Sequence, residues 1–128
     1  MHQINTKINL GDINIHYKHW GGSGQQIFLL HGLASNLQIW NLVAPNLVAK
    51  GYSVVAIDQR GHGLSGQPSQ GYDFDTISND AVRTMAYMNL DNPIVIGHSW
   101  GGNVAVHIGA HFPDRIRGIC LIDGGLIE

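Results

Sequence analysis

The sequence feature that most constrains the fold is a run of ten residues, 93–102, that reads PIVIGHSWGG. Its first part, residues 94–96, is short and apolar, which is typical of a strand buried on both faces. The run ends in a glycine-rich turn, and the apolar residues of the following stretch, 103–112, recur at helical spacing. The segment therefore predicts a buried strand, a very tight turn and a helix, with Ser99 at the apex of the turn.

The glycines around Ser99 have the spacing of the G-x-S-x-G nucleophile elbow, in which a serine hydroxyl projects from the end of a strand into a cleft. Residues two before and two after the serine crowd each other in this turn, and Gly97 and Gly101 relieve the crowding because they have no Cβ. The next helix points its N-terminus at the turn, where free N–H groups favour developing negative charge. We therefore predict that Ser99 is a catalytic nucleophile. The alternative is a glycine-rich turn with an incidental serine.

Composition restricts the class of protein. The 128 residues are 44% hydrophobic and 12% charged, which predicts one globular domain over residues 1–128. The formal net charge is -2, and no basic run suggests nucleic acid or an anionic membrane as a partner. No apolar run has the length of a membrane helix, and no signal peptide is visible. The single cysteine, Cys120, excludes an internal disulfide and fits a reducing compartment, so we expect a cytoplasmic protein with Cys120 in its core.

The rest of the chain alternates predicted strands and helices. Strands are expected at 4–10 and 13–20, which form a hairpin, and at 27–30, 54–57 and 118–123. Helices are expected at 36–50, with Leu37, Trp40, Val43 and Leu47 inward, and at 76–89, with Asp75 as its cap and Ile77, Val82, Met85 and Met88 in the core. A hairpin followed by alternating strands and helices predicts an α/β fold with a mostly parallel sheet and helices on both faces.

A second motif, His31-Gly32-Leu33, directly follows the predicted strand 27–30. Acyl transfer turns the attacked carbonyl into an oxyanion, which needs two backbone N–H donors. One donor is expected on the residue after the nucleophile, Trp100, and the other on this earlier loop, at Leu33. Gly32 would let the loop approach the substrate, and His31 is expected to hold the turn through side-chain hydrogen bonds.

Three segments together resemble an α/β-hydrolase: FLLHGLAS at 28–35, VVAIDQRGHGLS at 54–65 and GHSWGG at 97–102. They follow the family's order and spacing and match its N-terminal half. The resemblance implies a serine hydrolase of the carboxylesterase type that forms an acyl-enzyme at Ser99, uses no cofactor and acts on a small ester or carbonyl substrate. Family members with an aspartate nucleophile cleave epoxides or carbon–halogen bonds, and Ser99 argues against those. Asp58, Arg60, Gly61 and His62 match a family loop that is mainly structural.

The resemblance also shows what is missing. The family triad runs serine, then acid, then histidine along the chain, yet no histidine follows His111. The triad histidine, the C-terminal strands and the cap therefore have no counterpart, and we expect a partial fold. Asp123, at the end of the last predicted strand, is a possible triad acid because some family members carry it there. The alternative is an aspartate that caps the following turn.

Three interpretations remain open: an incomplete serine esterase, a non-catalytic truncated protein or binding module, and one half of a split hydrolase whose second chain supplies the missing groups. The strand from Ile119 to Ile122 would lie at the edge of the sheet, so we expect self-association or a complementary chain there. His107 and His111 stand four apart on a predicted helix. With no acidic ligand or third histidine nearby, we expect no metal site.

Overall fold

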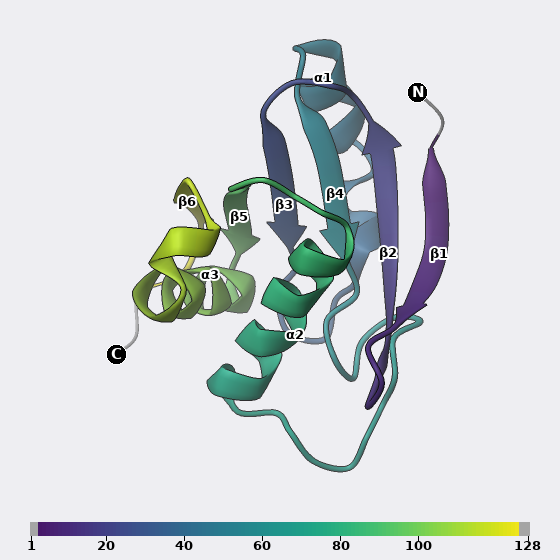
Figure 1. Cartoon of the computed structure of the whole chain (residues 1–128), viewed down its shortest axis with the longest axis vertical. Helices are drawn as coiled ribbons and strands as arrows, with labels where there is room; N and C mark the ends of the chain where they lie inside the picture. The colour runs from purple at the N-terminus through teal and green to yellow at the C-terminus, as the bar shows by residue number, and fades with distance from the viewer. Residues whose placement is uncertain (1–2, 126–128) are drawn as a thin grey trace.

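The computed structural model describes residues 3–125, which form one six-stranded sheet with helices on both faces (Figure 1). The strands are β1 (Ile4–Asn9), β2 (Asn14–Gly21), β3 (Gln26–Leu30), β4 (Ser53–Ile57), β5 (Ile94–His98) and β6 (Gly118–Ile122). Their order across the sheet is β1-β2-β4-β3-β5-β6. β1 and β2 form an antiparallel hairpin, β2 pairs antiparallel with β4, and the remaining pairs are parallel. The predicted α/β class with a mostly parallel sheet is confirmed.

The helices are α1 (Ala44–Ala49), α2 (Phe74–Tyr87) and α3 (Trp100–His111), with short 3₁₀ helices η1 (Leu37–Trp40) and η2 (Pro113–Arg115). In Figure 1, α2 and α3 lie in front of the sheet and α1 lies behind it. One apolar cluster, which includes Phe28, Met85 and Ile108, fills the space under α2 and α3. A second, which includes Leu29 and Trp40, lies on the opposite face. The parallel inner strands β3, β4 and β5 are mostly apolar because both of their faces are covered.

The prediction of one continuous helix over 36–50 is wrong. η1 ends at Trp40, a turn follows, and α1 begins at Ala44. Pro45 explains the break, since proline has no N–H and is tolerated in a helix mainly in the first turn. The chain therefore starts a new helix at this point. Val43, expected to face the core, is exposed in the turn.

The start of α2 also differs from the prediction. Asp73, not Asp75, is the N-cap: its carboxylate accepts hydrogen bonds from the Thr76 N–H at 3.0 Å and from the Thr76 hydroxyl at 2.8 Å. Asp75 consequently lies in the first turn of the helix with an exposed side chain that is free to contact another element. The predicted core face of the helix is confirmed, with Ile77, Val82 and Met85 buried and Met88 partly buried.

The C-terminal part of the described chain brings a further correction. Cys120 was expected in the core but is exposed, because β6 lies at the edge of the sheet. α3 begins at Trp100, directly after the elbow and three residues earlier than the periodicity of 103–112 predicts. Over residues 3–125, no helix combines the length and the apolar character that crossing a membrane requires.

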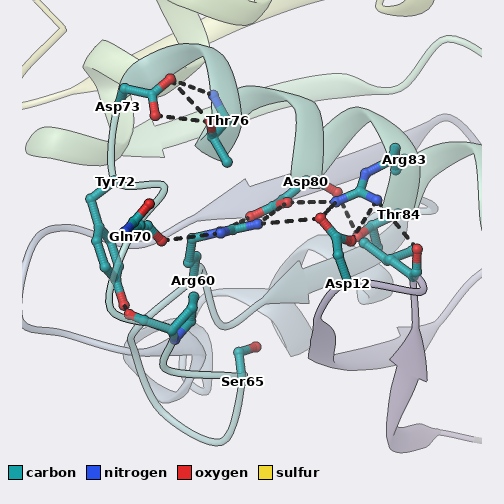
Figure 2. Close-up of polar contacts among 12 residues, drawn as sticks. Asp12, Arg60, Ser65, Gln70, Tyr72, Asp73, Thr76, Asp80, Arg83 and Thr84 are labelled. Carbon is teal, nitrogen blue, oxygen red and sulfur yellow. Dashed lines mark hydrogen bonds and ion pairs between the residues drawn. The ribbon is translucent and has the colours of Figure 1, made fainter.

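A polar network attaches the loop after β4 to α2 and to the β1–β2 turn (Figure 2). Arg60 donates to the Asp80 carboxylate from Nε at 2.8 Å and from Nη2 at 3.1 Å, and its Nη1 donates to the Gln70 carbonyl at 3.3 Å. Arg83 donates to the same carboxylate at 2.9 Å and to Asp12 at 2.8 Å. The hydrogen bonds with Asp80 raise the pKa of the buried Arg60 guanidinium. This network anchors a loop that runs beside the elbow.

Candidate active site

Ser99 stands between β5 and α3 in a conformation that non-glycine residues rarely adopt, with φ 55° and ψ −123°. Its backbone is held on both sides. The Ser99 N–H donates to the Ile122 carbonyl of β6 at 2.9 Å, and the Ser99 carbonyl accepts from the Gly102 N–H at 2.8 Å. The residue is exposed. The predicted strand, tight turn and helix are therefore present, with the serine at the carboxyl end of a parallel strand.

The glycines around Ser99 are required by close backbone contacts. A Cβ at Gly97 would collide with the Gly101 carbonyl, and a Cβ at Gly101 would collide with the carbonyl groups at the end of β3. Gly124, to which the sequence analysis gave no role at the site, packs against the elbow from the other side, where a Cβ would come within 2.6 Å of the Ser99 Cα. Its signal in the sequence is the pair of glycines directly after the last predicted strand.

The loop after β3 lies beside the elbow because β3 and β5 are parallel neighbours. A Cβ at Gly32 would lie 3.3 Å from the Ser99 Cβ. The Trp100 N–H is the first of α3 and has no acceptor within the helix. The Leu33 N–H donates no hydrogen bond to another described residue. The two backbone donors expected for an oxyanion thus lie in segments that flank the serine.

Two histidines hold this loop in place. The His31 ring is fully buried: its Nδ1 donates to the Gly32 carbonyl at 2.7 Å, and its Nε2 accepts from the Gln59 N–H at 2.9 Å. Burial lowers the pKa of His31 to about 4, so the ring is neutral at pH 7 and keeps both bonds. From the loop after β4, His62 Nε2 accepts from the Ala34 N–H at 3.0 Å. Both rings bond to the loop itself, as expected for His31.

Asp58 connects the segments around this loop. The residue is 2% exposed, and its carboxylate accepts from His16 Nδ1 at 2.7 Å, from the Leu37 N–H at 2.8 Å and from the Leu64 N–H at 2.9 Å. These partners come from β2, from the start of η1 and from the loop after β4. All of these bonds link backbone segments or buried side chains, which is the structural role that the family resemblance implies for Asp58.

The acid and the base of a triad are not assembled within residues 3–125. Asp123 directly follows β6, one residue after the Ile122 carbonyl that accepts from Ser99. Its φ is 52°, its side chain is exposed, and it forms no side-chain hydrogen bond within that range. Over the same residues, no histidine nitrogen hydrogen-bonds to the Ser99 hydroxyl. The structure brings the loop at Gly32 against Ser99 and places Asp123 directly after β6, the strand whose Ile122 carbonyl accepts from Ser99.

The sequence analysis expected no acidic ligand near His107 and His111, and this is wrong. An acidic group does lie beside His107 and His111: Asp75 Oδ1 is 2.7 Å from His107 Nε2. The three side chains each offer a ligand atom, and these atoms lie within 4.8 Å of one another. The sequence gave no local signal of this contact because the partners are 32 residues apart and meet only where α2 packs against α3.

The location of Ser99 agrees with a general property of open α/β sheets. Ligands bind outside the carboxyl ends of the strands, at the point where the strand order reverses. Here β4 lies on one side of β3 and β5 on the other, so the order reverses between β3 and β5. The Leu33 loop follows β3 and Ser99 follows β5. The crevice expected from topology therefore coincides with the crevice expected from the motifs.

Comparisons with known proteins agree with this geometry. A family model described as alpha/beta hydrolase fold matches residues 26–128. The chain is 37% identical over 110 residues to a putative non-heme chloroperoxidase from Synechocystis sp., covering 85% of this chain and 40% of that protein. It is 30% identical over 122 residues to 2-(acetamidomethylene)succinate hydrolase from Mesorhizobium japonicum, covering 95% of this chain and 43% of that protein. The crystal structure of Cfl2 from Burkholderia cenocepacia matches with a TM-score of 0.91 and 26% identity, covering 97% of this chain and 42% of that one.

The chain spans about two fifths of the length of these relatives. The part matched by the family model contains both the loop at 31–33 and the elbow at 97–102. Sequence motifs, sheet topology and similarity to known proteins thus lead to one conclusion: this chain belongs to the α/β-hydrolase family.

Proposed function

We propose that this chain carries the nucleophile and the oxyanion hole of a serine hydrolase that cleaves ester or related carbonyl bonds. The observation that supports this most directly is the backbone of Ser99, an exposed non-glycine residue at φ 55°. Such strain persists where the surroundings over-determine it, and it concentrates at functional sites. Here Gly97, Gly101 and Gly124 provide the space for it, and the Ile122 carbonyl holds it.

The chemistry follows from these positions. The Ser99 Oγ attacks the carbonyl carbon, a C–O bond forms, and the carbonyl electron pair moves onto its oxygen. The N–H groups of Leu33 and Trp100 donate to this oxyanion. When the oxyanion collapses, the alcohol leaves with the proton that the serine lost, and an acyl-enzyme remains. Water then attacks the acyl carbon, so that the acid is released and the Ser99 hydroxyl is restored.

A general base is needed to take the serine proton. In the family order a histidine follows the acid along the chain, and here no histidine follows His111. In this proposal the histidine is supplied from outside these 128 residues, by a longer polypeptide or by a complementary chain. Asp123 is the candidate acid that would orient it.

A fluorophosphonate probe with peptide mass spectrometry tests the proposal. We expect the folded protein to be labelled at Ser99, and Ser99→Ala to abolish the labelling. Ser69→Ala is the matched control, because Ser69 is also an exposed serine but lies in the loop before α2. Labelling that persists in Ser99→Ala, or labelling of the folded protein at another serine in preference to Ser99, would contradict the assignment.

A second candidate function is a module that binds carbonyl compounds without turning them over. It is favoured by the absence, within residues 3–125, of an imidazole bonded to the Ser99 hydroxyl. Loss of a triad histidine lowers kcat by about 10⁶-fold and leaves about 10³–10⁴-fold catalysis over water. We therefore expect the 128-residue chain alone to hydrolyse a p-nitrophenyl ester only at this residual level. A turnover of about 1–10³ s⁻¹ would contradict this expectation, and a rate restored by a second polypeptide would favour a split hydrolase.

A further inference from the structure

We propose that Asp75, His107 and His111 form a binding site for a divalent transition-metal ion, with Zn²⁺ as the expected occupant, between α2 and α3. The site is separate from the proposed hydrolase site. His107 lies eight residues after Ser99 (107 − 99), on the helix that begins at the elbow. That separation corresponds to about 12 Å along the helix axis.

The spacing of the three side chains suits a metal ion. His107 and His111 are four apart on α3 and therefore share a face of the helix. Asp75 reaches them from the first turn of α2, and the three ligand atoms lie within 4.8 Å of one another. Ligands about 2.1 Å from a tetrahedral zinc lie roughly 3.4 Å apart. The adjustment needed is of the order of 1 Å, and the exposed side chains of Asp75 and His111 are free to make it.

The His111 ring is in the tautomer that a metal ligand requires. His111 Nδ1 lies 3.0 Å from the His107 carbonyl. A carbonyl can only accept, so Nδ1 carries the hydrogen and the neutral ring has its lone pair on Nε2. Metal-bound histidines usually donate their other N–H to a carbonyl or carboxylate in this way. The His107 ring is stacked between Phe74, with ring centroids 5.9 Å apart, and His111, with centroids 4.0 Å apart. Because an imidazole lone pair lies in the ring plane, the exposed His111 ring must rotate out of this stack to share an ion with His107.

Binding requires the other tautomer of His107. In the metal-free geometry His107 Nε2 lies 2.7 Å from Asp75 Oδ1, which requires a hydrogen on Nε2 because the carboxylate accepts. The metal takes the place of this hydrogen, and the proton moves through solvent to Nδ1, so that the ligand is a neutral imidazole. The carboxylate that was the hydrogen-bond acceptor then becomes the third ligand.

The donor set selects the ion. Two imidazole nitrogens and one carboxylate suit zinc and its transition-metal neighbours, whereas Mg²⁺ and Ca²⁺ prefer oxygen ligands. Three protein ligands leave a fourth position open. Asp75 and His111 line a surface pocket of about 530 Å³, in which water can fill that position. Arg83 lines the same pocket, but its charge is balanced by Asp12 and Asp80.

The metal would connect the beginning of α2 to the end of α3. A ligand that binds only the folded state stabilises it in proportion to the logarithm of its concentration over Kd. Since the ligands come from two helices, unfolding would separate them. We therefore expect zinc to link α2 to α3, the helices that cover the front face of the sheet in Figure 1, and to stabilise the folded state.

Isothermal titration of Zn²⁺ into the purified protein, in a buffer free of chelators, tests the proposal. We expect one zinc ion per chain, and Mg²⁺ should give no binding. Asp75→Asn, His107→Ala and His111→Ala should each weaken zinc binding by about tenfold or more. Two control substitutions should leave the affinity for zinc unchanged. Asp114→Asn removes an exposed carboxylate just after α3, and Asn79→Ala alters the wall of the same pocket.

Two further measurements locate the ion. Zinc should raise the Tm of the protein but not of His111→Ala, and crystals grown with zinc should show an anomalous peak about 2.0–2.1 Å from both ring nitrogens. The proposal is overturned if no saturable binding occurs below about 1 mM, if the three substitutions leave it unchanged, or if the ion binds elsewhere. Labelling of Ser99 by the fluorophosphonate should not depend on zinc. The zinc-site proposal and the hydrolase proposal can therefore fail independently of each other.

Discussion

His31 shows how the surroundings of one residue set its chemistry. Its ring is fully buried, and this burial lowers its pKa from 6.5 to about 4. In the unfolded chain the ring titrates near pH 6.5, so between pH 6.5 and 4 the unfolded state binds a proton that the folded state does not. The stability that depends on the neutral ring is therefore complete above pH 6.5 and is lost as the pH falls towards 4.

This difference gives a measurable pH dependence. Between pH 7 and pH 4.5 the wild-type protein should lose about 2–3 kcal/mol more stability than His31→Asn, since each unit of pKa difference corresponds to about 1.4 kcal/mol. Urea unfolding at the two pH values measures the change. His111→Ala, which removes an exposed ring, should keep the wild-type pH dependence. Equal losses in wild type and His31→Asn would show that the folded ring titrates normally.

At the scale of elements, the N-cap of α2, Asp73, and Asp80 within the helix have different structural roles. Asp73 caps the first turn from an exposed position, whereas Asp80 is 1% exposed and accepts from both Arg60 and Arg83. An exposed cap acts on one helix end. A buried carboxylate holds together every segment that donates to it. Substituting Asp80 should therefore lower the free energy of unfolding more than substituting Asp73.

Asp73→Ala should lower the Tm by about 3–5 °C, because the Thr76 N–H loses its acceptor. Thermal unfolding followed by circular dichroism measures this. Asp114→Ala, which also removes an exposed carboxylate, should change the Tm by less. A Tm of Asp73→Ala equal to that of wild type would show that the cap contributes nothing to stability.

Asp80→Asn should cost about 3 kcal/mol, because removing one partner of a buried ion pair leaves the other charge uncompensated. The uncompensated group is Arg60, which is buried in the loop after β4 and is drawn with its partners in Figure 2. Denaturant unfolding measures the loss. Asp12→Asn is the control within the same network, and its effect should be smaller because the Asp12 side chain is 61% exposed. Similar losses for the two variants would contradict this ranking.

At the scale of the whole molecule, the sheet has an unpaired edge at β6. Within residues 3–125 this strand pairs only with β5, and Ile119, Leu121 and Ile122 are 40%, 37% and 42% exposed. Free backbone groups flanked by apolar side chains are a template for pairing with another chain. No residue of β6 itself is charged, and Arg117 precedes the strand and Asp123 follows it. We predict that the 128-residue chain self-associates, or binds a complementary chain, along β6.

Size-exclusion chromatography with light scattering tests this prediction. We expect species larger than a monomer at micromolar concentration, and Ile119→Lys should restore much of the monomer because a charge on the edge strand opposes pairing. Ile39→Lys is the matched control: Ile39 is 42% exposed but lies on η1, so the substitution should leave association unchanged. A wild-type protein that elutes as a sharp monomer peak would contradict the prediction.

The elbow and the alternation of elements could be predicted because they depend on interactions between residues close in sequence. Gly97 and Gly101 are four apart, and the crowding between them follows from any turn sharp enough to expose Ser99. The apolar runs of β3, β4 and β5 likewise report burial on both faces wherever the strands lie. The α/β class with a mostly parallel sheet could therefore be predicted from local pattern, whereas the α/β-hydrolase family came from the resemblance of three segments to it.

Tertiary packing decided the features that depend on distant partners. Cys120 has the sequence context of a core residue but is exposed, because its strand lies at the sheet edge. Asp75 looked like a helix cap, yet its partner is His107, 32 residues away. The position of Gly124 against Ser99 is set by the parallel pairing of β6 with β5. Local sterics and periodicity are encoded in short stretches of sequence, whereas contacts between elements exist only once the sheet and helices have packed.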